Sequence, residues 1–348
     1  MNLRENVPLA PLTTLGIGGP ARYFGQARTT TDLVEMITWA RNHRLPFFLL
    51  GGGSNLVFDD TGFPGLVIAL AMKGIEYRQN NQNRDVEVTA AAGELWDDFV
   101  AEAVARNLAG IECLSGIPGL VGAAPIQNIG AYGQEVSQTI TEVEILNLET
   151  MQVESWDNAR CAFAYRDSVF KGAWRDRAVV LSVRFNLRRN GKATVTYPDL
   201  TKRLPKDASV AKARAAVLIV RGEKSMLADP TDPNARSCGS FFTNPILDPE
   251  AYAAFQTRCR EPHPAYAQDD GRVKLSAAWL IDHSGFKKGL VRGGVGLSQK
   301  HCLALINRGS GSSAEVIALK NEIQDGVLQR FGVRLEPEPL ILAGREKP

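Results

Sequence analysis

Two glycine-rich stretches constrain this chain more than any other feature of its sequence. The first, Gly51-Gly52-Gly53-Ser54-Asn55, directly follows residues 46–50, an apolar run typical of a short buried strand. Glycine permits positive φ and lets backbone amides approach an anion closely, and the serine and asparagine add polar donors. We therefore predict that all five residues bind a phosphate-rich cofactor; the alternative is a tight turn in solvent.

The second stretch covers residues 115–133 and contains five glycines and two prolines. It is too apolar for an exposed loop, and its small residues would let a large ring lie flat against the main chain. The alternative is a buried turn that supports a sheet. The residues predicted to contact the cofactor here are Gly116, Ile117, Pro118, Gly119, Gly122, Ala123, Gln127, Asn128, Gly130 and Tyr132.

Two familiar nucleotide motifs fail in context. Residues 16–21 match G-x-G-x-x-A, but no buried strand precedes them and strand-like residues 22–24 follow in place of a helix. Residues 221–225 lack the Gly-Lys pair and the upstream glycine of a P-loop. The sequence therefore favours neither a Rossmann fold nor a P-loop.

Composition excludes several classes of protein. A net charge of +2 gives no case for nucleic acid binding, and the longest apolar runs are far shorter than the roughly 18 residues of a membrane span. The five cysteines show no C-x-x-C spacing, so we predict reduced, mostly buried thiols. The four histidines form no metal-binding pattern, so we predict no metal site. We expect a cytoplasmic protein.

Hydrophobic periodicity predicts strands and helices in a mixed order, with many strands between residues 45 and 190. Residues 1–20 are expected to be mostly irregular, and residues 227–236 to form an exposed linker at a domain boundary. Predicted strands cover 46–50, 65–70, 86–92, 178–188 and 302–307, with a hairpin over 142–155. Predicted helices cover 31–44 (capped by Thr30 or Thr31), 95–108, 208–224, 249–260, 276–284 and a long one from Ser312 or Ser313 to Phe331.

Three further segments carry chemistry. They read F-A-Y-R-D-S-V-F-K at 163–171, G-S-F-F-T-N-P at 239–245 and L-E-P-E at 335–338. An arginine, a serine and a glutamate thus stand in three separate contexts, suited to an anion clamp and a proton donor. With the two glycine loops, this combination indicates an enzyme, and more narrowly a flavin-dependent reductase.

From Pro11 to about Leu342 these motifs together resemble the UDP-N-acetylenolpyruvoylglucosamine reductase (UDP-N-acetylmuramate dehydrogenase, MurB) family, in its subtype with an extra tyrosine loop. The resemblance implies an α+β fold, with an FAD-binding domain of the vanillyl-alcohol-oxidase (PCMH) type and a smaller α+β substrate-binding domain. The implied ranges are 1–70 for the first FAD-binding subdomain, joined by the tail 334–348, then 71–220 for the second, and 221–333 for the substrate domain. The PCMH-type region spans about 17–189.

The resemblance also implies an activity. Enzymes of this family use NADPH and non-covalent FAD to reduce the enolpyruvyl ether of UDP-N-acetylglucosamine to UDP-N-acetylmuramate, with hydride to C3 and a proton to C2. The product serves peptidoglycan synthesis, and so cell-wall formation, cell shape and division. We expect a monomer with small-molecule partners only. Two alternatives stay open: an FAD-dependent oxidase of the same superfold, and a non-catalytic nucleotide-sugar binding protein.

Site residues follow from the matching positions. Arg166 matches the catalytic arginine, Ser240 the proton donor and Glu338 the catalytic glutamate. Each assignment has a structural alternative: a surface ion pair for Arg166, a turn hydroxyl for Ser240 and a strand-edge charge for Glu338. For Tyr197 and His301, two of the predicted substrate contacts, the alternative is plain packing. The predicted substrate contacts are Tyr165, Lys224, Asn244, Tyr197 and His301.

The chain departs from the family pattern at three positions. Thr243 stands where lysine is frequent, Cys238 where alanine is usual, and Pro339 where valine is common. The proline restricts the backbone of Glu338 to an extended conformation, which suits a catalytic group on a strand.

Overall fold

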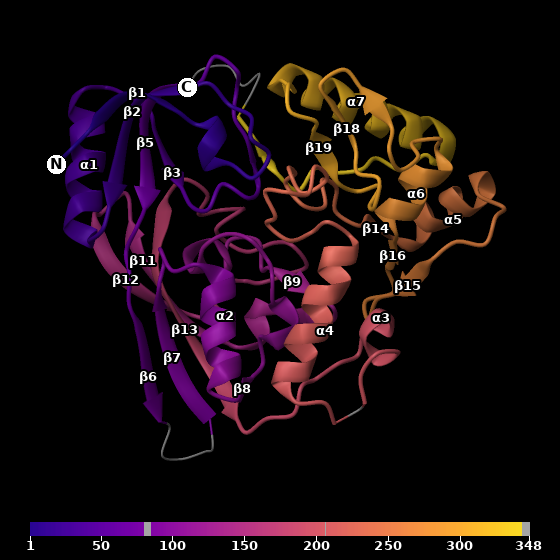
Figure 1. The fold of residues 1–348 in the computed structure, drawn as a ribbon, viewed down its shortest axis with the longest axis horizontal. Helices are drawn as coiled ribbons and strands as arrows, with labels where there is room; N and C mark the ends of the chain where they lie inside the picture. Colours follow the sequence, from indigo (N-terminus) through magenta and orange to yellow (C-terminus); the bar gives the residue numbers. More distant parts are fainter. Residues whose placement is uncertain (80–84, 206, 343–348) are drawn as a thin grey trace. The chain divides into compact units, whose positions relative to one another are not determined.

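The computed structural model describes residues 1–79, 85–205 and 207–342, and these form two compact units (Figure 1). Unit 1 comprises Met1–Val7, Ala21–Gly53 and Pro64–Leu227. Unit 2 comprises Pro8–Pro20, Ser54–Phe63 and the chain from Ala228 on. The boundary falls at the start of the predicted linker 227–236.

This division differs from the implied ranges, which put residues 1–70 in a single subdomain. Residues 8–20 and 54–63 belong to unit 2 because their apolar side chains, among them Leu15, Ile17 and Val57, are part of its hydrophobic core.

Unit 1 begins with a four-stranded sheet, in the order β1-β2-β5-β3, packed against helix α1 (Thr30–Asn42). The strands are β1 (Arg4–Pro8), β2 (Pro20–Ala27), β5 (Phe63–Leu70) and β3 (Phe47–Leu50). Residues 1–20 are mostly irregular, as expected, but they also contain β1, whose mostly exposed edge position leaves no apolar alternation to detect. Helix α1 is capped by Thr29, one residue before the prediction, because Thr29 and Asp32 form a reciprocal capping box.

A second, antiparallel sheet forms the larger part of unit 1, in the order β12-β11-β13-β7-β6, with β8 (Leu108–Ala109) paired to β13. Its strands are β6 (Ile75–Gln79), β7 (Asp85–Ala91), β11 (Ile140–Asn147), β12 (Gln152–Asp157) and β13 (Ala178–Arg189). The predicted hairpin is confirmed as β11 and β12. Figure 1 shows α2 (Trp96–Ala105) in front of β7 and β13, and buried side chains of all three share one core.

The glycine-rich region of unit 1 is built from short elements rather than long ones. They are η2 (Glu112–Leu114), η3 (Val121–Ala123), β9 (Gly130–Ala131), β10 (Gln134–Glu135) and η4 (Val136–Gln138). Two helices complete the unit, α3 (Pro198–Thr201) and α4 (Val210–Glu223). The predicted helix 208–224 is confirmed as α4, and Ser209 caps it.

The described residues of unit 2 form three main helices and three small sheets. The helices are α5 (Pro249–Arg258), α6 (Ala277–His283) and α7 (Ser313–Phe331), all at predicted positions, and Ser312 caps α7 through a capping box with Glu315. The predicted strand 302–307 is shorter, because residues 301–304 form a turn before β19. The remaining elements are η1 (Ala10–Leu12), β4 (Leu56–Val57), β14 (Ile246–Leu247), β15 (Ala265–Ala267), β16 (Val273–Leu275), β17 (Val291–Arg292), β18 (Val295–Leu297), β19 (Leu305–Asn307) and β20 (Leu340–Ile341).

The tail of the chain returns to an early segment within unit 2. Strand β20 pairs in parallel with β4, so that Leu340 lies opposite Leu56. The segment that precedes β20 is thereby fixed beside residues that follow the first glycine loop.

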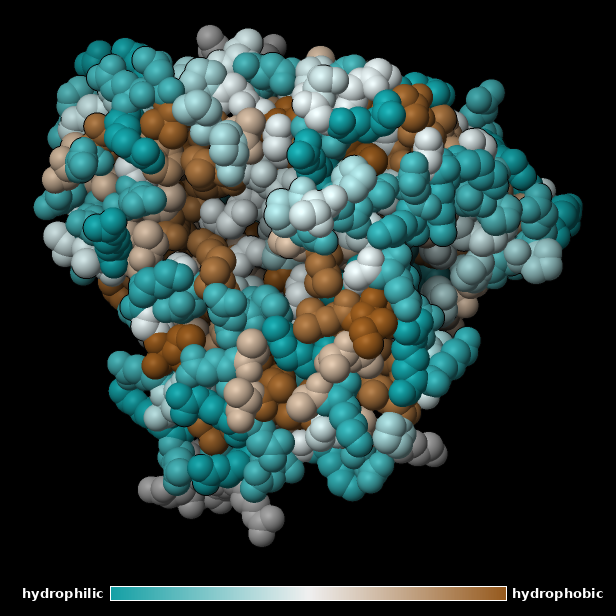
Figure 2. Space-filling model, viewed as in Figure 1, coloured by the Kyte–Doolittle hydropathy of each residue, from teal (hydrophilic) through white to brown (hydrophobic). Residues whose placement is uncertain are grey.

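The burial of the cysteines and the hydropathy of the surface agree with the predictions from composition. All five cysteines are free and buried, as predicted. Figure 2 shows hydrophilic side chains over much of the visible face, with hydrophobic ones in smaller groups between them. Over the described ranges, no helix has the length and apolar character that crossing a membrane requires, and no group of acidic, histidine and cysteine side chains is arranged to hold a metal ion.

Candidate active site

The first glycine loop begins where β3 ends, and its backbone touches the second loop. A Cβ added to Gly52 would lie 2.6 Å from the Cα of Gly119, so only glycine allows this approach. Gly53 is buried and has a φ of 63°. Among the described residues, the amides of Gly52 and Gly53 form no hydrogen bond. Two touching loops with unused amides make a cradle that fits a phosphate-bearing cofactor.

The second glycine loop is pinned at its start by an ion pair between two helices. The amide of Gly116 donates to Oδ1 of Asp97 at 2.5 Å, and Arg214 on α4 donates to both oxygens of the same carboxylate at 2.6 and 2.9 Å. Burial disfavours the charged carboxylate, but the hydrogen bonds from Arg214 and Gly116 outweigh it and lower the pKa of Asp97. The start of the loop is therefore held by a charge.

Asn128 lies deep in the second loop, and its side chain is used within the protein. It is 1 % exposed. Nδ2 donates to Glu135 and to the carbonyl of Ala164, both at 3.0 Å, and Oδ1 accepts from the amide of Ser137. These contacts give Asn128 a supporting role in the loop, which sequence reasoning had taken only as a cofactor contact.

Arg166 stands on a tight turn. The amides of Ala164 and Asp167 donate to each other's carbonyls at 3.0 and 3.1 Å, and Arg166 between them has a φ of 54°. Its Nη2 donates to the carbonyl of Gly130 at 2.5 Å, and its guanidinium lies over the ring of Tyr165. The carboxylate of Asp167 accepts from the amide of Ser168. Arg166, the residue predicted to bind an anion, is thus positioned at the second glycine loop.

Two predicted substrate residues meet at the end of α4. Lys224 donates to Asp199 at 2.9 Å, and the ring of Tyr197 packs edge-on against Tyr132 at 5.4 Å. Burial opposes the charge of Lys224, but Asp199 outweighs it and raises the pKa of the amine. Burial also raises the pKa of Tyr132. Sequence reasoning missed Asp199, which follows the predicted tyrosine by two residues.

In unit 2 the structure brings the predicted serine and glutamate into neighbouring segments. The amide of Glu338 donates to the carbonyl of Phe241 at 2.9 Å, next to Ser240. The side chain of Asn55 donates to the carbonyl of Glu338 at 3.2 Å. The predicted catalytic serine and glutamate therefore share one small region with Asn55, the last residue of the first glycine loop.

The three departures from the family pattern surround this region. Thr243 bonds through its amide to the carbonyl of Glu336 at 3.0 Å, so it continues the pairing. Cys238 donates to the carbonyl of Leu56 at 3.3 Å, and burial raises its pKa to about 12, so its thiol stays protonated. Pro339 is buried directly after the glutamate. The fold therefore accommodates all three residues.

Two further predicted substrate residues of unit 2 make local contacts. Oδ1 of Asn244 accepts from the amide of Ala277 at 2.9 Å and so holds the first residue of α6. Nδ1 of His301 accepts from the amide of Leu303 at 3.4 Å. Their roles toward a substrate stay predictions.

Comparison with known proteins decides the family. Residues 229–342 match the UDP-N-acetylenolpyruvoylglucosamine reductase C-terminal domain, and residues 21–153 match an FAD binding domain. The UDP-N-acetylenolpyruvoylglucosamine reductase of Thermobifida fusca (strain YX) is 45% identical, covering 97% of this chain and 97% of the relative. That of Streptomyces avermitilis is 47% identical, covering 97% and 94%. The chain belongs to the UDP-N-acetylenolpyruvoylglucosamine reductase family.

A solved structure of this family agrees. The crystal structure of UDP-N-acetylenolpyruvylglucosamine reductase (MurB) from Thermus caldophilus is 26% identical, covers 98% of this chain and 99% of that one, and superposes with a TM-score of 0.67. Family membership confirms the expected α+β fold with an FAD-binding domain and the expected oxidoreductase class.

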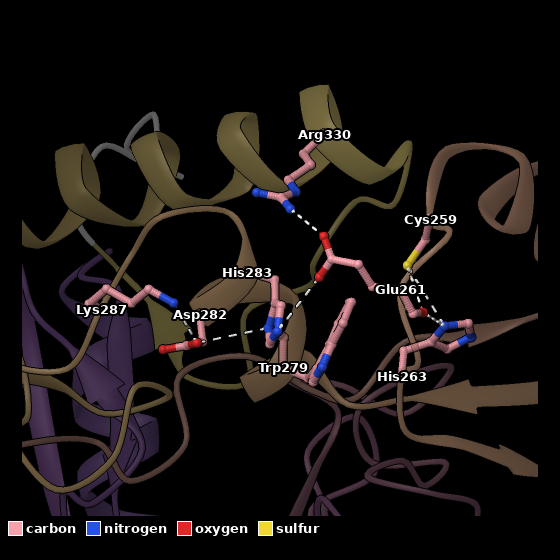
Figure 3. Close-up of polar contacts among 8 residues, drawn as sticks. All are labelled: Cys259, Glu261, His263, Trp279, Asp282, His283, Lys287 and Arg330. Carbon is pink, nitrogen blue, oxygen red and sulfur yellow. Dashed lines mark hydrogen bonds and ion pairs between the residues drawn. The ribbon is translucent and has the colours of Figure 1, made fainter.

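Figure 3 shows a polar cluster of unit 2 that contains none of the predicted residues. Glu261 bonds to Arg330 of α7 at 3.1 Å and lies 3.9 Å from His283 of α6. Nearby, Sγ of Cys259 is 3.7 Å from Nδ1 of His263. Motif reasoning gave no signal for this cluster, because its members belong to separate segments without a recognisable spacing.

Proposed function

We propose that this chain reduces the enolpyruvyl ether of UDP-N-acetylglucosamine to UDP-N-acetylmuramate, using NADPH and non-covalently bound FAD. The reaction supplies a peptidoglycan precursor. The observation that carries the proposal is the near full-length similarity to reductases of that name, combined with an arginine held at the glycine loop of an FAD-binding domain. We also propose that the protein acts as a monomer in the cytoplasm.

The residues of both glycine loops fit FAD. The amides of Gly52 and Gly53 would hold the pyrophosphate, and the small residues of 116–133 would lie against the ring. When bound and reduced by NADPH, FAD would supply the hydride that reduces the double bond. Cys113, near the second loop, is buried with its pKa raised by burial to about 12, and neither loop contains a histidine. These features favour a non-covalent cofactor over the tethered flavin of an oxidase.

Arg166 is proposed to hold the substrate carboxylate. Adding hydride to C3 builds negative charge on C2 and on that carboxylate, and the fixed fork of a guanidinium matches two carboxylate oxygens at once. An interaction that strengthens as charge develops lowers the barrier by a few kcal/mol, about a hundred- to thousandfold in rate.

Ser240 is proposed to deliver the proton to C2. A serine hydroxyl is a weak acid at neutral pH, so its developing alkoxide needs support. Glu338, on the neighbouring segment, is the proposed helper. Lys224 is cationic at neutral pH, since Asp199 more than offsets the effect of burial on its pKa, and a cation suits a diphosphate. The other proposed substrate contacts are Tyr165, Tyr197, Asn244 and His301.

One experiment tests the function. The purified protein should be yellow, with about one FAD per chain that acid releases. Anaerobic NADPH should bleach the flavin, and the enolpyruvyl nucleotide sugar should then restore its absorption. Flavin that stays with acid-precipitated protein would indicate the oxidase, and protein without flavin would indicate the binding module.

A separate measurement, gel filtration at several protein concentrations, tests whether the protein is a monomer.

A further inference from the structure

The turn that carries Arg166 is held by three side chains, none of which is proposed to contact the substrate. We propose that Asn128, Ser168 and Lys171 are positioning residues, which fix the guanidinium of Arg166 at the second glycine loop. This inference rests on the proposed function of Arg166. We call residues 164–167 the arginine turn and the three side chains the clamp.

The arginine turn needs support because its backbone is strained. Among its four residues only Arg166 has a positive φ, at 54°. A turn of this kind, with positive φ at its third position, favours glycine there because a Cβ is crowded in that conformation. A non-glycine residue persists in the left-handed region only where the surrounding contacts offset the strain. Such strain is frequent at functional sites.

Each member of the clamp donates to a backbone carbonyl. Asn128 donates to Ala164 at 3.0 Å, and Ser168 donates to Ile126 at 2.5 Å. The first bond ties the start of the arginine turn to the second glycine loop, and the second ties the residue directly after the turn to the same loop. Lys171 donates to the carbonyl of Arg166 itself at 2.7 Å and so holds the strained residue directly.

The clamp and the guanidinium use neighbouring points of the same loop. The carbonyl of Ile126, the side chain of Asn128 and the carbonyl of Gly130 each bond to the segment around the turn, and Gly130 accepts from Arg166. The loop and the turn are therefore joined at alternate residues. Loss of one clamp bond does not change the guanidinium of Arg166 itself, but it widens the range of positions that the group occupies.

The exposure of each clamp side chain shows whether its loss would also affect the stability of the fold. Asn128 and Ser168 are only 1 % and 4 % exposed, so their loss also affects folding. Lys171 is exposed, and an exposed charged group contributes little to stability. Lys171 therefore provides the cleaner test.

The experiment compares the two half-reactions in anaerobic stopped flow. Lys171→Met should slow reoxidation of reduced flavin by the enolpyruvyl substrate about threefold, and Ser168→Ala about tenfold, because a misplaced group loses transition-state contacts. Flavin reduction by NADPH should stay within about twofold of wild type. Lys171→Arg keeps a donor and should restore most of the rate. Lys192→Met, which removes an exposed lysine paired with Asp207, is the matched control and should change neither rate.

A kinetic double-mutant cycle decides whether the clamp acts through Arg166. In the Arg166→Ala background, Lys171→Met and Ser168→Ala should cause no further slowing of reoxidation. If they slow it by the same factor as in wild type, or if Lys171→Met alone leaves the rate unchanged, the clamp proposal is overturned. If Arg166→Ala itself reoxidises at the wild-type rate, the proposed function of Arg166 fails instead. Thermal unfolding midpoints of the Lys171→Met and Lys192→Met proteins should agree.

Discussion

Arg166 and Ser240 are placed by different physical means, each within its own unit. Arg166 occupies a left-handed turn held by side chains that donate to backbone carbonyls. Ser240 precedes an extended segment that pairs with the tail through main-chain bonds, such as the one from Glu338 to Phe241. Main-chain pairing tolerates many side chains, whereas a clamped turn depends on particular ones. Substitutions near Arg166 should therefore affect catalysis more widely than substitutions near Ser240.

Buried aromatic rings make the Ser240 region robust. Phe241 and Phe242, which follow the serine directly, are 0% and 1% exposed, and they lie in the core of unit 2. The serine is thus carried by a segment whose position is fixed by burial. The arginine turn has no comparable apolar anchor among its own four residues, since none of them is buried.

Ser240→Ala should have the largest kinetic effect. Reoxidation of reduced flavin by the enolpyruvyl substrate should slow by about a thousandfold or more, because only this half-reaction needs a proton at C2. Flavin reduction by NADPH should remain nearly unchanged, and the unfolding midpoint should hardly move because main-chain pairing holds the segment. Equal slowing of both half-reactions, measured in stopped flow, would show that Ser240 is structural.

Arg166→Lys should come next, with reoxidation slowed about a hundredfold or more. Lysine keeps the charge but loses the two-pronged fork, so it should be nearly as damaging as alanine. Flavin content and thermal stability should barely change. A lysine variant that retains more than about a tenth of the wild-type rate would contradict a bidentate role.

Arg166→Gly sharpens the comparison as a backbone control. Glycine accepts the positive φ of the turn, so this variant should be more stable than Arg166→Ala by about 1 kcal/mol. Both variants should be equally inactive. Thermal unfolding of the two proteins under the same conditions measures the difference. Equal stabilities would mean that the turn relaxes freely, against the strain inferred here.

Much of the fold and part of the candidate site could be predicted from the sequence. Capping boxes and the β11–β12 hairpin are local patterns, so helix α7 and this hairpin lay where expected. The bonds between Asp97 and Arg214, or between Asn128 and Ala164, join residues far apart in the chain. No periodicity or spacing reports such pairs, and so the sequence marked Asn128 as a cofactor contact without its supporting role.

Asp97→Asn should weaken the support of the second glycine loop. The folded pKa of Asp97 lies below its ordinary value of 3.8, so the stabilisation is fully present above that pH and is lost as pH falls through the folded pKa. The carboxylate is still 36% exposed and partly screened, so at pH 7 the loss should be about 1 kcal/mol. Denaturant unfolding at pH 7 and below pH 4 checks this: the difference from wild type should shrink in acid.

Glu261→Gln should have the smallest effect. It tests a polar cluster that belongs to neither the Arg166 region nor the Ser240 region. The polar cluster of Figure 3 contains many ionisable groups, yet its contacts join partly exposed side chains to one another, and Glu261 itself is 53% exposed. Solvent screens such pairs, so stability should fall by about 0.5 kcal/mol at low salt and less at high salt. Both half-reactions should run at the wild-type rate, because none of the residues proposed for catalysis contacts Glu261 within the part of the chain that the structure describes. A slowed reoxidation in this variant would show that a cluster of exposed ion pairs controls the reaction, and that the strained, clamped turn is not the decisive feature.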